Sequence, residues 1–317
     1  MNLKDLSLQI TEEEYRELPE INYSLLSTFN NKSILAITEK QEETSSLLLG
    51  SLVDFMLTSD SSWRDKYIVL DSNIPLRAVN TIKMIKEGFD LEYSVVQNYP
   101  SNWKPETSIN KYNSEIGNFV LEDDKIIVPE DLFNKAADIV KKIQEHSLAC
   151  LYFGNSQLEM YHQLKFKAVI DNIGYKCMID AIHVDSLHKC ITPIDLKTTS
   201  KHIWQFPESF IYYNYWIQAN LYTDILKENL KGTEYENYTI NPYRFVVANS
   251  LENEPCIVYQ FISGKTPQGL KVKYNKTYKE LAEEINPYLY EEKVVLPREF
   301  RNLIVELDEF LSYDYVK

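Results

Sequence analysis

The sequence predicts an α/β fold of the α+β kind, in which helices flank a central β-sheet. Three stretches in the middle of the chain are rich in β-branched and aromatic residues: 157–169, 174–184 and 190–198. The short polar segments 171–174 and 185–189 separate them, which predicts an antiparallel meander. Residues 207–230 are then typical of a helix, with Pro207 in the first turn and Gly232 just past the end. Two more β-rich stretches follow: 242–249 and 256–262.

Helices are expected on both sides of this β-rich region. The predicted helices are 23–40, with Ser24 as N-cap; 45–58; 129–148, which has acids at its start and lysines near its end; and much of 266–312, with breaks around Pro287 and Pro297. Residues 59–127 are mixed in character. Because no Pro/Gly/Ser-rich linker divides the chain, we expect one domain over residues 1–317. Within it, residues 1–150 are mostly helical, 151–262 form a sheet-and-helix core and 263–317 form a helical tail.

Composition and charge exclude several classes of protein. The content of 44% hydrophobic and 25% charged residues is that of a soluble globular protein. The first residues lack the basic and apolar regions of a signal peptide, and no apolar run approaches the ~18 residues of a membrane span. The cysteines at 150, 177, 190 and 256 match no common zinc motif and are expected to be free thiols. These features predict a cytoplasmic protein.

The net charge of −14 counts against a protein that coats nucleic acid through its overall field. Positive charge is gathered locally instead. Residues 159–204 hold six lysines against five acids, and residues 264–279 hold five lysines and no acid. Any contact with DNA would therefore use local patches.

Two aspartates and a lysine in the meander point to a specific chemistry. Asp195 and Lys197 are two residues apart on one predicted strand and so face the same way, and the turn at 185–189 brings Asp180 near them. Two carboxylates without a cation would repel each other, whereas Mg²⁺ prefers such hard oxygen ligands. A bound metal polarises a phosphate and lowers the pKa of a bound water, and a lysine offsets developing negative charge. The pattern predicts metal-dependent phosphodiester cleavage.

Flanking residues add to this pattern. Glu159 lies on the preceding strand, and Asp54 interrupts an otherwise apolar stretch, where a carboxylate is costly unless it is paired or binds a metal. Gln218 and Tyr222 are four residues apart and so share one face of a helix. Each of these features alone is compatible with a solvated or structural role.

Taken in order, these residues resemble the PD-(D/E)xK nuclease superfamily, and within it the RecB-like and RecE-like exonucleases (exodeoxyribonuclease VIII). The resemblance rests on Gly50-xxx-Asp54, Glu159, Ile179-Asp180, Asp195-x-Lys197-Thr198-Thr199, Gln218-xxx-Tyr222 and the opening segment Ile21-Asn22-Tyr23-Ser24-xx-Ser27-x-Phe29. It spans roughly residues 21–222. Two positions depart from the pattern: Asp54 stands where many relatives have histidine, and Ile179 stands in place of the proline.

The resemblance implies a mixed central sheet flanked by helices and a set of site residues. Asp180 and Asp195 would bind Mg²⁺, with Mn²⁺ able to substitute, and the Leu196 carbonyl would be a further ligand. Lys197 would be the catalytic lysine. The implied supporting residues are Glu159 and Asp54 at the metal, and Gln218 and Tyr222 beside DNA.

The resemblance also implies an activity and partners. RecE-like enzymes digest one strand of linear duplex DNA from its 5′ end, often as homo-oligomeric rings, in phage or bacterial recombination alongside a single-strand annealing protein. An acidic exterior would suit a ring whose basic surface faces a channel. The candidate phosphate-binding lysines are Lys271, Lys273 and Lys276; a solvated helix face is the alternative.

Other functions stay open at this point. The same core serves endonucleases and single-strand nucleases, and a retired nuclease fold could bind DNA ends or build a virion. A serine hydrolase is disfavoured because no G-x-S-x-G occurs, and a nucleotide-binding loop because no Gly-rich loop occurs. The four histidines at 162, 183, 188 and 202 are more typical of solvated or hydrogen-bonded side chains than of a zinc site.

Overall fold

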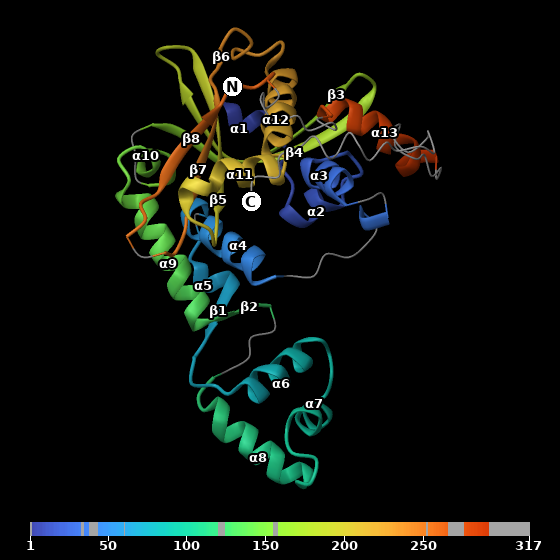
Figure 1. Ribbon diagram of the computed structural model, residues 1–317, viewed down its shortest axis with the longest axis vertical. Coiled ribbons are helices and arrows are strands. Elements are labelled where there is room, and N and C mark those ends of the chain that lie inside the picture. The colour runs from blue at the N-terminus through green and yellow to red at the C-terminus, as the bar shows by residue number, and fades with distance from the viewer. Residues whose placement is uncertain are drawn as a thin grey trace, which may run out of the picture. The chain divides into compact units, whose positions relative to one another are not determined.

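The computed structural model describes residues 2–32, 35–37, 44–59, 61–119, 124–154, 158–251, 253–265 and 276–291. The chain divides into two compact units (Figure 1). One unit comprises Met1–Glu42 with Lys142–Lys317, and the other comprises Glu43–Lys141. The single-domain organisation expected from the sequence stays a prediction.

A mixed β-sheet forms the centre of the first unit. Its long strands are β3 (Glu159–Ile170), β4 (Ile173–Asp185), β5 (Cys190–Thr198), β7 (Tyr243–Ala248) and β8 (Ile257–Phe261), hydrogen-bonded in that order, and the short β6 (Thr239–Ile240) pairs with the start of β5. β3, β4 and β5 form the predicted antiparallel meander. β7 then runs parallel to β5, and β8 runs antiparallel to β7. The predicted fold class, a mixed central sheet flanked by helices, is confirmed.

Helices from both ends of the chain cover this sheet. They are α1 (Leu3–Leu6), α2 (Glu12–Glu17), α3 (Tyr23–Asn31), α10 (Ala149–Phe153), α11 (Phe206–Tyr212), α12 (Tyr215–Leu230) and α13 (Tyr278–Glu291), with 3₁₀ turns at Leu35–Ile37 and Ile203–Gln205. None of the helices in the described portion of the chain has the length and apolar character needed to cross a bilayer.

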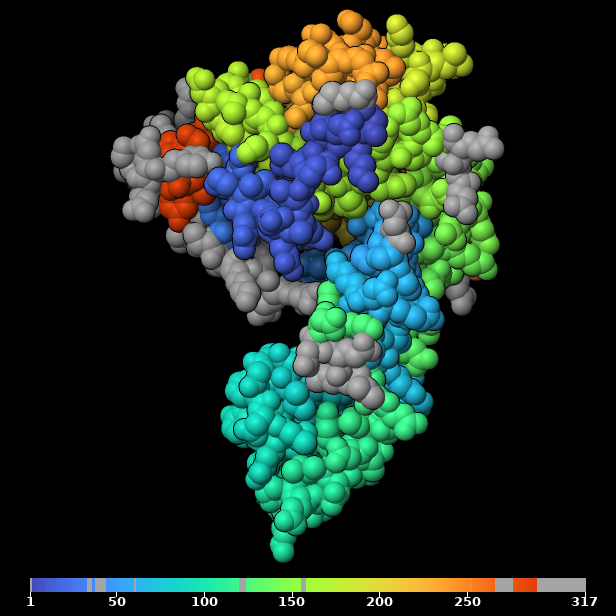
Figure 2. Space-filling model, turned by 180° about the vertical axis from the view of Figure 1, so that it is seen from behind, coloured from blue at the N-terminus to red at the C-terminus, as the bar shows by residue number. Residues whose placement is uncertain are grey.

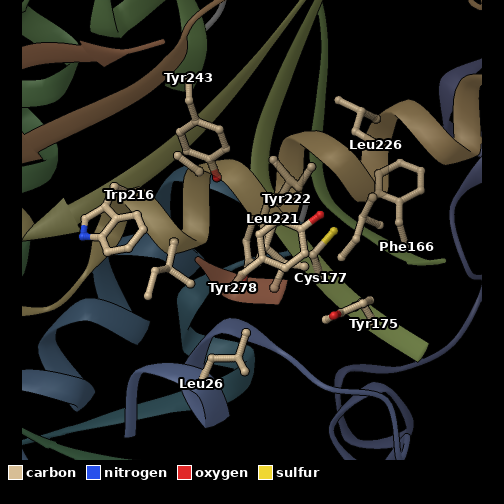
Figure 3. Close-up of a cluster of buried hydrophobic side chains, with 14 of the residues drawn as sticks. Leu26, Phe166, Tyr175, Cys177, Trp216, Leu221, Tyr222, Leu226, Tyr243 and Tyr278 are labelled. Carbon is tan, nitrogen blue, oxygen red and sulfur yellow. The ribbon is translucent and has the colours of Figure 1, made fainter. Parts of the chain in front are cut away.

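The main core lies where α12 packs on the sheet. Trp216, Leu221 and Leu226 of α12 belong to one buried cluster with Phe166 and Cys177 of the β3–β4 hairpin (Figure 3). The N-terminal segment reaches the same hairpin, because the Leu8 amide donates to the Lys165 carbonyl at 2.8 Å. In the space-filling view these first residues lie beside the strands (Figure 2). Burial of this apolar surface is the main force that holds the helices on the sheet.

Two predicted helix features are wrong in detail. Asn22, not Ser24, caps α3, because its side chain accepts from the Leu25 amide at 2.9 Å. α13 also continues through Pro287, where a break was predicted. Proline there removes one backbone hydrogen bond, but Leu281, Ala282 and Ile285 of the same helix are buried and hold it on the core. Pro297 and the rest of the tail lie outside the described residues.

The predicted helix 207–230 is divided into α11 and α12 at Asn214. Asn214 adopts φ 58° and ψ 39°, in the left-handed region that asparagine tolerates better than most residues. Gln218 and Tyr222 both lie in α12, after this division.

The second unit contains helices and one small sheet. Its elements are α4 (Ser45–Thr58), α5 (Trp63–Lys66), β1 (Tyr67–Leu70), α6 (Leu76–Lys86), α7 (Leu91–Asn98), α8 (Pro105–Ile116), β2 (Ile126–Pro129) and most of α9 (Glu130–Glu145). β1 and β2 are parallel. Ala78, Ile82, Val95 and Tyr112 form a small core among α6, α7 and α8, and these three helices make one continuous cyan-to-green surface in Figure 2.

We expect the stability of this unit to depend on pH through Glu115. Hydrogen bonds from the Arg77 guanidinium, followed by one from the Tyr99 hydroxyl at 2.8 Å, lower the pKa of the Glu115 carboxyl to about 2. Because this pKa lies below its ordinary value, the stabilisation is present above about pH 4.5 and is lost as the pH falls towards 2. Glu115→Gln should lower the free energy of unfolding by about 1–2 kcal/mol near neutral pH, a value reduced for the solvent exposure of Arg77.

Urea unfolding followed by circular dichroism at about pH 7 and about pH 3 measures this effect. The exposed Glu106, on the same helix, provides the control. Glu106→Gln should change little at either pH. An equal loss for both variants, or a Glu115→Gln loss that does not shrink in acid, would contradict the assignment.

Candidate functional site

The site lies where β4 and β5 separate. Their pairing runs from Asp185↔Cys190 to Ala181↔Ile194 and stops there. The next opposed residues would be Asp180 and Asp195. Instead of a backbone ladder, the Asp180 Oδ2 accepts a hydrogen bond from the Leu196 amide at 2.8 Å. The two carboxylates predicted from the sequence are therefore brought together at the point where the sheet opens.

Asp195 and Lys197 form an ion pair inside this opening. Asp195 is 2% exposed, and its Oδ2 lies 2.6 Å from the Lys197 Nζ. Its Oδ1 accepts from the Gln218 amide nitrogen at 2.5 Å. β7, paired to the far edge of β5 at Asp195↔Phe245 and Lys197↔Val247, holds this stretch of β5 in the sheet after the pairing with β4 has ended. The Asp-x-Lys spacing thus places both charged groups on one face, as predicted.

Burial and the ion pair have opposite effects on the pKa values of Asp195 and Lys197. Burial raises the pKa of the Asp195 carboxyl, while Lys197 and Gln218 act to lower it. Burial is the largest single effect on Lys197 and acts to lower its pKa. The charge of Asp195, with smaller contributions from Tyr215, Asp180 and Tyr23, outweighs burial in sum, so the pKa of Lys197 is raised and the ammonium is kept. Lys197 therefore offers a fixed positive charge within the site.

An aromatic ring completes the surroundings of Lys197. Its Nζ lies 4.5 Å from the ring centroid of Tyr215, the first residue of α12, a distance suited to a cation–π contact. Tyr215 was not predicted as a site residue. The sequence signal that could have found it is its position three residues before Gln218, on the same face of the helix.

Strand β3 adds an unusual residue opposite Asp180. The pairs His162↔Ala181 and Leu164↔Ile179 place Gln163 across from Asp180. Gln163 has φ 52°, in the left-handed region, which is rare inside a strand and strains a residue other than glycine. No sequence pattern indicates this conformation. It interrupts the regular β3 backbone at the level of the two aspartates.

Glu159 does not join this site. It pairs with Val184, four residues along β4 from Asp180, which corresponds to about 13 Å of strand at the usual rise. Its carboxylate accepts from the Tyr161 hydroxyl at 2.7 Å and from the Ser186 hydroxyl at 3.0 Å. The expectation that Glu159 helps to hold a metal is corrected by this register, because Gln163 occupies the β3 position nearest to Asp180.

Gln218 and Tyr222 lie inside the protein and not on its surface. Gln218 is 4% exposed and contacts Asp195, and Tyr222 is 8% exposed. Figure 3 shows the Tyr222 ring among Leu221 and Cys177 in the core. Burial raises the pKa of Tyr222 well above its ordinary value, so the phenol is neutral. The expectation that these two residues contact DNA is therefore corrected: Gln218 supports Asp195, and Tyr222 packs behind the site.

The predicted lysine patch is only partly described by the structure. Lys271 and Lys273 lie outside the described residues. Lys276 is paired with Glu284 at 2.8 Å, and both side chains are 15% exposed. The charge of Lys276 is thus balanced within the protein, which makes it a poor phosphate contact.

Asp54 belongs to α4 in the other compact unit and is partly buried. Its helix, Ser45–Thr58, matches the predicted 45–58. Its role as a metal ligand stays a prediction.

The donor atoms at the opening fit a hard cation. Asp180 and Asp195 supply carboxylate oxygens. The Leu196 carbonyl points to the same edge of β5 as the Leu196 amide, because both groups of one strand residue face one neighbour. The Gln218 Oε1 is buried and accepts no hydrogen bond from the described chain, which leaves one more oxygen beside Asp195 for an outside partner. No three histidine, cysteine or acidic side chains gather as a metal site among the described residues, so waters would complete the shell, as they commonly do for Mg²⁺.

Comparisons with known proteins agree with the fold. No protein-family model matches the chain, and no curated protein matches its sequence. Among solved structures, the chain is similar to a crystal structure of a "putative exonuclease" from Eubacterium rectale, with a TM-score of 0.51 and 13% sequence identity over 96% of this chain and 100% of that one. This likeness shows that the two chains share a fold.

Proposed function

We propose that the protein is a metal-dependent nuclease that hydrolyses phosphodiester bonds in DNA. The observation that carries this proposal is the opening between β4 and β5, where Asp180, Asp195 and Lys197 converge. Two carboxylates with a lysine held beside them match the needs of phosphodiester cleavage, in which negative charge develops on phosphate oxygens. The fold of the Eubacterium rectale protein supports the same class of enzyme.

Each residue has a distinct task in this proposal. Asp180, Asp195 and the Leu196 carbonyl would hold Mg²⁺, for which Mn²⁺ would substitute. When bound, the metal would supply Lewis acidity towards the phosphate and lower the pKa of a bound water. Lys197 offsets developing negative charge and orients the attacking water, while Tyr215 and Asp195 hold its ammonium in place. Gln218 orients Asp195.

The finer activity we propose is that of a RecE-like exonuclease. It would digest linear duplex DNA from the 5′ end as a ring-shaped homo-oligomer, in phage or bacterial recombination with a single-strand annealing protein. The sequence motifs around Asp195-x-Lys197 and Gln218-xxx-Tyr222 support this activity.

End-labelled substrates test the function. With Mg²⁺, linear duplex DNA labelled at the 5′ end should release labelled mononucleotide early, whereas the 3′ label should be released late. A covalently closed circle should stay intact, and EDTA should stop all cleavage. If the closed circle were cut, the enzyme would be an endonuclease and not an exonuclease. If EDTA did not stop cleavage, the reaction would not depend on a metal.

A second candidate is a retired nuclease that binds DNA ends without cutting them. One observation favours it: the residue opposite Asp180 on β3 is the amide Gln163 and not a third acid. Titration calorimetry with Mn²⁺ separates the two functions. A cutting enzyme should bind Mn²⁺ and lose this binding in Asp195→Asn, whereas a retired protein should bind DNA ends with no metal response.

A further inference from the structure

A row of aromatic rings leads from Lys197 to the protein surface. The Lys197 Nζ lies 4.5 Å from the Tyr215 ring centroid. The Tyr213 ring lies 5.6 Å from that of Tyr215 at an interplanar angle of 31°, and the Tyr212 ring meets that of Tyr213 edge to face, at 4.9 Å and 89°. Exposure rises along the row, to 43% for Tyr213 and 69% for Tyr212. Two adjacent exposed rings beside a buried charged site offer a contact surface to a partner that has flat apolar faces.

Helix α3 holds the backbone under these two rings. The Tyr213 carbonyl accepts from the hydroxyls of Tyr23 at 2.5 Å and Ser27 at 3.0 Å. The Tyr212 carbonyl accepts from the Asn31 amide at 3.2 Å. Tyr23, Ser27 and Asn31 recur every four residues and so line one face of α3, which explains the spacing in the opening segment of the sequence.

The corner between α11 and α12 is fixed from the other side as well. The Asn214 side chain donates to the Asn31 Oδ1 at 2.7 Å and is 7% exposed. Its left-handed backbone forms the break between α11 and α12, directly after Tyr212 and Tyr213. Both rings remain partly exposed at this corner, Tyr212 more than Tyr213, so an outside partner can reach them.

We propose that Tyr212 and Tyr213 form a stacking platform for the bases of a single DNA strand that enters the site. This inference rests on the proposed nuclease function, and it names the form of the substrate at the site: a strand whose bases are unpaired. Flat aromatic rings on a rigid support stack on any base, which gives affinity without sequence preference. The ring row would place the bases next to the scissile phosphate while Lys197 faces the phosphate itself.

Binding of short oligonucleotides tests the platform. Fluorescence anisotropy in EDTA, where no cleavage is expected, would compare a labelled dT 12-mer with a 12-mer of abasic sites that carries the same phosphates. Tyr212→Ala/Tyr213→Ala should weaken dT binding by about tenfold for each ring lost, and should leave abasic binding unchanged. Tyr212→Phe/Tyr213→Phe keeps both rings and should bind dT as the wild type does.

A matched control comes from the other compact unit. Tyr93 is 48% exposed, so Tyr93→Ala removes a similar ring and should leave dT binding unchanged. Thermal unfolding by circular dichroism shows whether the double alanine variant is folded. Equal dT binding in that variant, or an equal loss on dT and abasic strands, would overturn the platform.

The platform and the nuclease function fail separately. If the wild type cuts DNA with Mg²⁺ but the alanine variant binds dT normally, the platform is wrong and the nuclease stands. If the wild type never cuts DNA but the alanine variant binds dT more weakly than the wild type and binds the abasic strand equally well, the platform is supported and the nuclease function is wrong.

Discussion

Lys197→Ala is expected to lower the rate of DNA cleavage by about 10²–10³-fold while Mn²⁺ binding is retained. The ammonium lies 2.6 Å from Asp195 and is the group in the opening between β4 and β5 that we assign to the developing negative charge. The two aspartates remain in the variant, so the metal site should survive. Single-turnover cleavage of linear duplex DNA measures the rate, and calorimetry measures metal binding.

Asp195→Asn should affect metal binding as well as cleavage, unlike Lys197→Ala. Asparagine keeps the shape of the side chain but removes a charged ligand, so Mn²⁺ binding and cleavage should be lost together. Lys231→Ala, at the exposed end of α12, is a matched lysine control and should cleave at the wild-type rate. A Lys197→Ala enzyme with wild-type activity would refute the assignment of the site.

Stability needs to be followed in both variants because the ion pair is buried. Removing one partner leaves the other without its counter-charge, which commonly costs about 3–5 kcal/mol. Asp195→Asn/Lys197→Met removes both charges and should recover part of this loss. If this double variant unfolds like the wild type yet does not cleave, the loss of activity is chemical in origin.

Lys176→Met is expected to destabilise the first unit by about 2–4 kcal/mol. Lys176 of β4 is 3% exposed, and its ammonium donates to the carbonyls of Tyr15, Arg16 and Leu18 at 2.9, 3.0 and 2.5 Å. These carbonyls lie at the end of α2, where the last turn of a helix leaves its carbonyls without intrahelical donors. Methionine keeps most of the volume but leaves all three carbonyls without this donor.

The opposite strand offers a matched control. Lys167 pairs with Lys176 across β3 and β4, and its side chain is 51% exposed and 3.5 Å from Glu20. Lys167→Met should change the free energy of unfolding by less than about 0.5 kcal/mol, as surface ion pairs usually do. Urea unfolding measures both variants. A similar small effect for both would show that Lys176 does not fasten α2 to the sheet.

Local sequence patterns are sufficient to predict the sheet and the central residues of the site. Alternating strand patterns and short polar turns predict β3, β4 and β5 close to their observed bounds, and the bounds of β5 were predicted as 190–198. Asp195 and Lys197 share a face because side chains in a strand alternate, which is a local property. The turn at 185–189 fixes the register that brings Asp180 opposite Asp195.

Tertiary packing determines which other residues lie beside Asp180, Asp195 and Lys197. Glu159 and Gln163 differ by four residues, and only the pairing with β4 shows that Gln163 is the neighbour of Asp180. Gln218 faces Asp195 and Tyr222 faces the core because α12 packs on the sheet at one particular rotation. Side chains on one face of α3 donate hydrogen bonds to the carbonyls of Tyr212 and Tyr213, which lie about 180–190 residues away in the sequence. Contacts of this length depend on the packing of whole elements, which no local pattern encodes.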